Sequence, residues 1–149
     1  MKRIVIDASS LLASLLPAEE YQAHADALIQ LHANDELRLC APPLLASEIQ
    51  NALYLAVRGK AGRPPRLSLE GAKERWRLFR DLQIVLTEPD GERVLELANQ
   101  YRMRSAYDAV YLALAEQLKF ELVTSDKAFL TLLKDQVWVK PLWTFTAEV

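Results

Sequence analysis

Four acidic residues stand where a carboxylate can do chemistry: Asp7, Glu48, Asp108 and Asp126. Asp7 directly follows the short apolar stretch "RIVI", and Asp126 follows "ELVTS". If both stretches are strands of one parallel sheet, the two carboxylates emerge at the same sheet edge, where ligands bind in such folds. Clustered carboxylates repel one another unless protons or cations neutralise them. Oxygen-only ligands suit Mg²⁺ or Mn²⁺ and make a poor zinc site, so the four acids together predict a magnesium or manganese site.

Three of the acids also have a purely structural explanation. Asp7 and Asp126 each precede a helix-like pattern, and an aspartate at that position commonly caps the helix. Asp108 follows Ser105 at the spacing of a capping box, with Asp where Glu or Gln is usual, and a first-turn acid suits the helix dipole. Taken singly, capping is the better interpretation of Asp7 and of Asp126.

Glu48 is harder to explain as structure alone. It lies inside "PPLLASEIQNALYLAV", where helical spacing places it in the apolar sector between Leu55 and Ala52. A mid-helix residue cannot cap, and a buried carboxylate must be protonated, paired or bound to a cation. No basic residue lies within one turn of Glu48, so a cationic partner would have to come from a distant part of the chain.

The other reactive residue types form no recognisable site. Cys40 is the only cysteine, so no internal disulfide is possible, and it is expected to pack in a buried strand. His24 and His32 are expected to face solvent on a polar helix. No Ser–His–Asp set, phosphate-binding loop or dinucleotide glycine fingerprint is present.

Apolar periodicity predicts helices that alternate with short strands. The expected helices span 9–16, 19–34, 43–58, 68–81, 90–103, 106–118 and 127–134. The expected strands span 3–6, 37–40, 83–87, 121–124 and 136–140. This order predicts an α/β fold with a mainly parallel sheet of about five strands, covered by helices on both faces.

Size and composition fit one ordinary domain over residues 1–149. No apolar run approaches the roughly 20 residues of a membrane span, and the start lacks a signal-peptide layout, so we expect a soluble intracellular protein. The net charge is −2, but residues 58–80 hold eight basic and two acidic side chains. This stretch can face a polyanion, although a solvated helix face explains the charges equally simply.

Four segments, taken in order, resemble the motifs of PIN-domain ribonucleases. They are "VIDASSLLASLL", "SEIQNAL", "AYDAVYLALAEQL" and "LVTSDKAF". The subgroup most similar in size and motif is the VapC type, the toxin of VapBC toxin–antitoxin pairs. The resemblance implies a three-layer α/β/α sandwich, in agreement with the order of elements above.

The resemblance also implies roles for particular residues. It assigns metal binding to Asp7, Asp108 and Asp126, a catalytic role as ligand or base to Glu48, and support of the site to the hydroxyls of Ser9 and Thr124. The implied activity is Mg²⁺- or Mn²⁺-dependent hydrolysis of RNA phosphodiester bonds, with basic residues of 58–80 following the RNA backbone. The implied setting is a cytoplasmic homodimer inhibited by a VapB-like antitoxin.

Alternatives from other classes remain at this point. A PIN nuclease that processes RNA without an antitoxin carries the same motifs. A receiver-like signalling domain also binds Mg²⁺ at strand ends, but "QIVLTEP" offers no aspartate to accept a phosphoryl group. A haloacid-dehalogenase-like phosphatase needs an acid where Ser9 stands. A non-catalytic interaction module is disfavoured because all four acids are present.

Overall fold

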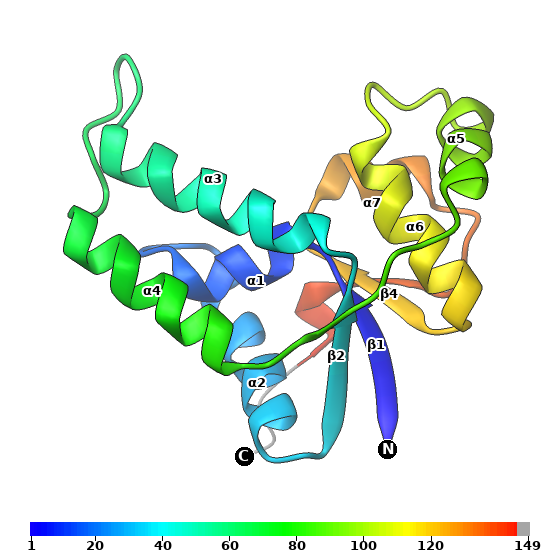
Figure 1. The fold of residues 1–149 in the computed structure, drawn as a ribbon, viewed down its shortest axis with the longest axis horizontal. Helices are drawn as coiled ribbons and strands as arrows, with labels where there is room; N and C mark the ends of the chain where they lie inside the picture. The colour runs from blue at the N-terminus through cyan, green and yellow to red at the C-terminus, as the bar shows by residue number, and fades with distance from the viewer. Residues whose placement is uncertain (146–149) are drawn as a thin grey trace.

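Five parallel strands form the centre of the fold in this computed structural model, which describes residues 1–145 (Figure 1). The strands are β1 (Lys2–Ile6), β2 (Leu37–Ala41), β3 (Val85–Leu86), β4 (Glu121–Thr124) and β5 (Val139–Pro141). Their order in the sheet is β3-β2-β1-β4-β5, and every neighbouring pair is parallel. The predicted parallel sheet is therefore confirmed.

The central strands are apolar because both of their faces are covered, as is usual in a parallel sheet. Ile4 and Val5 of β1 and Leu122 and Val123 of β4 are completely buried. The two strands pair in register from Ile4 to Ile6, so their carboxyl ends lie side by side. The segments that leave these strands therefore begin next to each other.

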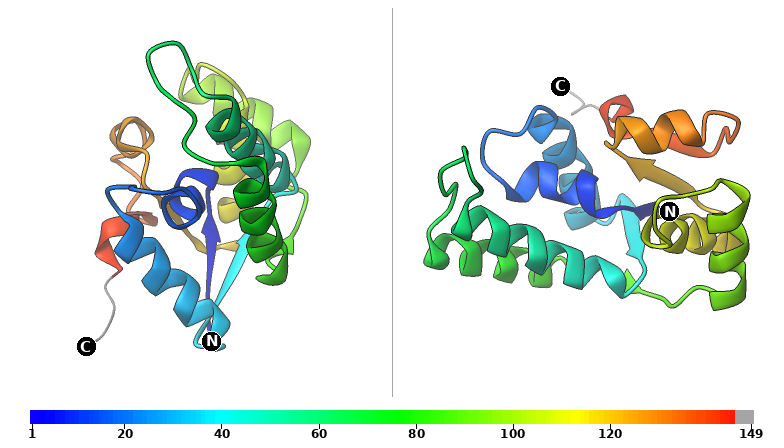
Figure 2. Two further views of the ribbon diagram at one scale, coloured as in Figure 1. Left: turned by 90° about the vertical axis from the view of Figure 1, so that its left-hand side faces the viewer. Right: turned by 90° about the horizontal axis from the view of Figure 1, so that it is seen from above.

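Helices cover both faces of the sheet and complete a three-layer α/β/α sandwich. Figure 2 shows α1 (Ala8–Leu15), α2 (Gln22–Ala33) and α7 (Lys127–Leu132) on one side of the strands. The other side carries α3 (Leu44–Arg58), α4 (Leu69–Asp81), α5 (Gly91–Gln100) and α6 (Tyr107–Leu118). A short 3-10 helix, η1 (Leu142–Thr144), follows β5. No helix among the described residues is long and apolar enough to cross a bilayer.

The helix α6 lies mostly in the core and carries Asp108 at its amino end. Its residues 109 and 111–115 are buried, and the helix packs against β1 and β4. A helix that is apolar on nearly all sides must be enclosed, as the sequence indicated. The amino end of α6, which carries Asp108, is fixed in this way.

The helices α3 and α4 and the loop 59–68 between them extend away from the strands, and we call this unit the arm (Figure 1). The helix α3 ends at Gly59, whose φ of 74° is easily adopted by glycine. Ser68 caps α4 by accepting a hydrogen bond from the backbone N–H of Gly71. The basic stretch noted in the sequence, residues 58–80, therefore covers the outer end of the arm and nearly the whole of α4, which runs back toward the strands (Figure 1).

Several local expectations were wrong. His24 is partly buried rather than solvent-facing, and its Nδ1 donates to the carbonyl of Phe145 at 2.5 Å. The strand expected over 83–87 contains only Val85 and Leu86, both exposed at the sheet edge. The helix expected from residue 19 begins at Gln22. His32 is buried rather than exposed: its Nδ1 accepts the N–H of Leu39 at 3.1 Å, and its Nε2 donates to the carbonyl of Leu82 at 2.6 Å.

Candidate active site

Asp7 occupies the junction between β1 and α1. Its backbone N–H continues the sheet ladder by donating to the carbonyl of Val123 at 3.2 Å. Its side chain caps α1 by accepting the N–H of Ser10 at 3.1 Å, as predicted. Only 7% of the residue is exposed. The cap fixes the direction of the carboxylate, which is then available for further contacts.

Two hydroxyl groups hold the Asp7 carboxylate. Ser9 Oγ lies 2.8 Å from Oδ1, and Thr124 Oγ1 donates to Oδ2 at 2.6 Å. Both hydroxyls also accept backbone N–H groups of the segment after β4, Ser9 from Ser125 and Thr124 from Asp126. The two hydroxyl residues singled out in the sequence therefore tie the ends of β1 and β4 together.

Asp7 carries a charge that no basic side chain compensates. Burial raises the pKa of Asp7 from 3.8 to about 6, although the hydrogen bonds from Thr124, Ser9 and Ser10 favour the charged form and lower the pKa. No ion pair in the described part of the chain involves Asp7. A buried carboxylate in this state is stabilised by a proton or by a cation supplied from outside the chain.

Asp126 begins α7 at the neighbouring strand end. Its Oδ1 accepts the N–H of Phe129 at 3.1 Å, which is the predicted cap of this helix. The residue is exposed, and together with Ser9 it lines a surface cavity between α1 and α7. Asp126 therefore combines a structural role with access to solvent.

Asp108 lies in the first turn of α6, but the capping box expected with Ser105 does not form. The cap residue of α6 is Ala106, which offers no side-chain hydrogen bond. Asp108 reaches solvent, yet partial burial and then the negative charge of Asp126 raise its pKa. The carboxylate is thus not used by the helix end, and it lies close enough to Asp126 to feel its charge.

Glu48 projects from the second turn of α3 and is half-buried, as its place in the apolar sector predicted. Its partner is neither Arg nor Lys but Tyr111 of α6, whose hydroxyl donates to Oε1 at 2.5 Å. Burial and then Asp108 raise the pKa of Glu48, whereas the tyrosine hydrogen bond lowers it. Glu48 is therefore held in place by a neutral donor and remains free to accept a proton.

Tyr111 of α6 holds Glu48 of α3 by a hydrogen bond, and the sequence interpretation missed this residue. The residue is almost completely buried, and its pKa is raised by burial, by Glu48 and then by the charges of Asp7 and Asp108. The phenol therefore stays protonated and keeps donating its hydrogen bond. The available signal was a tyrosine in an apolar helix three residues after an acid, since a buried tyrosine hydroxyl usually needs a partner.

The donor set fits a divalent cation with oxygen ligands. Three of the four acids have raised pKa values, and none of the four has a basic partner among residues 1–145. Within the same residues, no three His, Cys, Asp or Glu side chains are close enough to enclose a metal ion. Mg²⁺ does not require such a cage, because it keeps several waters and is commonly bound by one or two carboxylates.

Comparisons with known proteins agree with this architecture. The crystal structure of PAE2754 from Pyrobaculum aerophilum is similar with a TM-score of 0.70 and 26% sequence identity, over 96% of this chain and 92% of that one. No curated protein matches the chain significantly. The family model described as PIN domain matches residues 4–132, and PIN domains are typically nucleases that use divalent metal ions. The chain therefore belongs to the PIN domain family.

Proposed function

We propose that this protein is a metal-dependent ribonuclease that hydrolyses RNA phosphodiester bonds at the four acids Asp7, Glu48, Asp108 and Asp126, which we call the acidic centre. The observation that carries the proposal is that Asp7, Glu48 and Asp108, from three separate segments, lie near enough to the buried Tyr111 for their charges to raise its pKa, while no basic side chain within residues 1–145 pairs with them. Membership of the PIN domain family supports the same activity.

The residues divide between metal binding and proton transfer. Asp7, Asp108 and Asp126 hold Mg²⁺ or Mn²⁺ in this proposal, while Ser9 and Thr124 orient the Asp7 carboxylate. When bound, the cation lowers the pKa of water and offsets negative charge on the phosphate oxygens. Burial and then the charge of Asp108 raise the pKa of Glu48, which makes this carboxylate a stronger proton acceptor than an ordinary glutamate.

The proposed reaction is a direct displacement by water. The water oxygen attacks phosphorus and gives one proton to Glu48, while the bond between phosphorus and the 3′ oxygen breaks. The departing 3′ oxygen takes a proton from solvent, so the products carry a 5′-phosphate and a 3′-hydroxyl. Tyr111 keeps the Glu48 carboxylate directed toward the centre during this step.

Cleavage of a defined RNA in Mg²⁺ and in EDTA tests this proposal. Asp7→Asn and Asp108→Asn should each abolish cleavage, whereas Asp90→Asn, an exposed helix cap at the start of α5, should not. The 5′ ends of the products should be phosphorylated. Full activity of a carefully purified Asp7→Asn protein, or products ending in cyclic phosphates, would contradict the assignment.

We further propose that the nuclease is the toxin of a type II toxin–antitoxin pair and acts as a homodimer. The motif resemblance to VapC-type proteins supports this role. Expression of the chain alone in bacteria should arrest growth, and Asp7→Asn should relieve the arrest. A short DNA-binding partner should co-purify with the protein and block cleavage. A nuclease that is active in vitro but causes no arrest and has no such partner would favour an RNA-processing enzyme.

A further inference from the structure

The acidic centre cannot attract RNA by itself. Burial raises the pKa values of Asp7, Glu48 and Asp108, and a neighbouring carboxylate raises those of Glu48 and Asp108 further, so negative charge gathers here on a chain whose net charge is −2. An RNA backbone adds one negative charge per nucleotide and is repelled from such a region. Positive side chains elsewhere on the surface must therefore supply the attraction for RNA.

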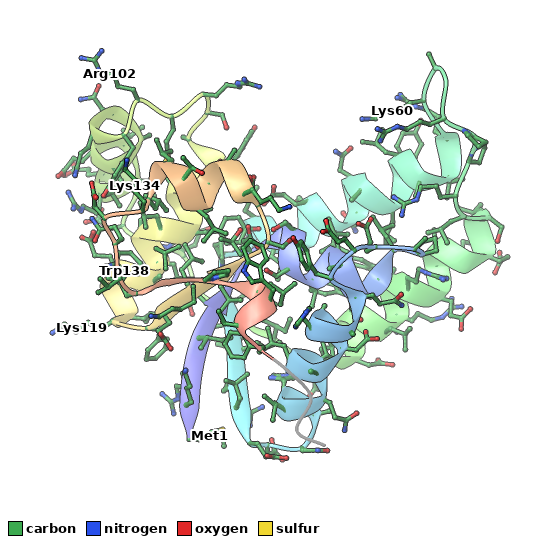
Figure 3. All side chains as sticks on the ribbon, turned by 180° about the vertical axis from the view of Figure 1, so that it is seen from behind. Met1, Lys60, Arg102, Lys119, Lys134 and Trp138 are labelled. Atoms are coloured by element: carbon green, nitrogen blue, oxygen red, sulfur yellow. The ribbon has the colours of Figure 1, made fainter. Side chains whose placement is uncertain are left out.

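One group of positive side chains lies at the end of the arm. Residues 49–69 contain no Asp or Glu, and we call Arg58, Lys60 and Arg63 within them the arm tip. All three are exposed, and none forms an ion pair within residues 1–145. Figure 3 places Lys60 at the far end of the arm. Arg58 donates to the carbonyl of Gly59 and lies over the ring of Tyr54, but no carboxylate of the described residues neutralises the positive charge of the arm tip.

A second group lies on the other side of the molecule, in the loop 101–106 between α5 and α6. Arg102 and Arg104 are exposed there and likewise have no ion pair in the described part of the chain. This loop leads directly into the helix that carries Asp108. In Figure 3, Arg102 lies at the upper left of the molecule and Lys60 at the upper right.

We propose that the RNA backbone is held at two basic ends, the arm tip and the loop 101–106, and passes across the acidic centre between them. This inference rests on the proposed ribonuclease function and adds how the substrate is held. Arg58 is ten residues after Glu48 in α3, which is about 15 Å along the helix. Stacked nucleotides rise about 3.4 Å each, so the arm tip contacts RNA roughly four nucleotides from the scissile bond.

The test measures binding of a labelled 20-nucleotide single-stranded RNA as a function of salt concentration. All proteins carry Asp7→Asn so that the RNA stays intact. One variant adds Lys60→Gln and Arg63→Gln, and a second adds Arg102→Gln and Arg104→Gln. The matched control adds Arg3→Gln and Lys119→Gln, which remove two exposed charges without ion pairs in residues 1–145, one in β1 and one at the carboxyl end of α6.

Each basic-end variant should reduce the slope of log affinity against log salt by about 1.4, because a single-stranded phosphate contact contributes about 0.7. The control should keep the parental slope, and a four-nucleotide RNA should show little difference between the proteins. A parental slope in either basic-end variant would overturn the two-ended arrangement. Mg²⁺-dependent cleavage by the unmodified protein reports separately on the nuclease proposal, so the two failures are distinguishable.

Discussion

Replacing Asp7 with Asn should stabilise the metal-free protein at neutral pH. Burial raises the pKa of Asp7 from 3.8 to about 6, so the folded protein holds this proton more tightly than the unfolded chain does. Well below pH 3.8 the carboxyl is protonated in both the folded and the unfolded state, so its burial costs no stability. As the pH rises from about 4 to 6, the unfolded chain ionises first and the folded state loses stability relative to it. Above about pH 6 the carboxyl is ionised in both states, and the folded protein bears the whole cost of burying this charge.

The size of this effect follows from the same pKa difference. A rise from 3.8 to about 6 corresponds to about 3 kcal/mol of unfolding free energy. Asn has nearly the same shape and remains neutral at every pH, but its single oxygen can accept from Ser10 or from Thr124 and not from both, so the gain is reduced by about one hydrogen bond. The variant should therefore be more stable than the parent by up to about 3 kcal/mol at pH 7, and most of this advantage should be lost near pH 4.

Urea denaturation in EDTA at pH 4 and pH 7 measures the difference. Asp90→Asn is the matched control, because Asp90 caps α5 in the same way but lies at the surface. Addition of Mg²⁺ at pH 7 should stabilise the parent and leave Asp7→Asn unaffected, since a ligand stabilises only the state that binds it. An Asp7→Asn protein that is less stable than the parent at pH 7 without metal would refute the reasoning.

Two further substitutions test individual contacts. Tyr111→Phe removes the hydroxyl that donates to Glu48, and a hydrogen bond to a charged group is worth about 1.5 kcal/mol. Because this bond lowers the pKa of Glu48, its loss should raise that pKa and shift the acidic limb of the cleavage pH profile to higher pH. Tyr107→Phe, at an exposed position of the same helix, should leave the pH profile unchanged. If Tyr111→Phe also leaves the pH profile unchanged, Tyr111 does not position Glu48. His32→Ala removes two buried backbone contacts and should lower the unfolding free energy by about 2–4 kcal/mol in urea; a loss below about 0.5 kcal/mol would contradict the structural role of His32.

Local sequence patterns predicted the fold well because each element has a clear apolar period. All seven helices and five strands were expected near their observed positions, and the caps formed by Asp7 and Asp126 were read from sequence spacing alone. The prediction for His32 was wrong because contacts with distant parts of the chain determine its burial. The hydrogen bonds of His32 come from β2 and from residue 82, and no local pattern around this histidine reveals them.

In the candidate site too, features set by local sequence were predicted, whereas contacts between distant segments were not. The sequence indicated that Glu48 is buried and needs a partner, because helical periodicity places it among apolar residues. It did not identify Tyr111, which lies in another helix and reaches Glu48 only after both helices pack on the sheet. Ser105 and Asp108 had the spacing of a capping box, but the first turn of α6 leaves Asp108 free to face the other acids.

Calorimetric titration of Mn²⁺ into the purified protein tests the central claim most directly, since it requires no knowledge of the RNA target. If the acids from distant segments form one centre, the unmodified protein and the Asp90→Asn control should bind Mn²⁺. Asp7→Asn and Asp108→Asn should each lose that binding while remaining folded. Undiminished Mn²⁺ affinity in either variant would show that these two carboxylates do not share an ion.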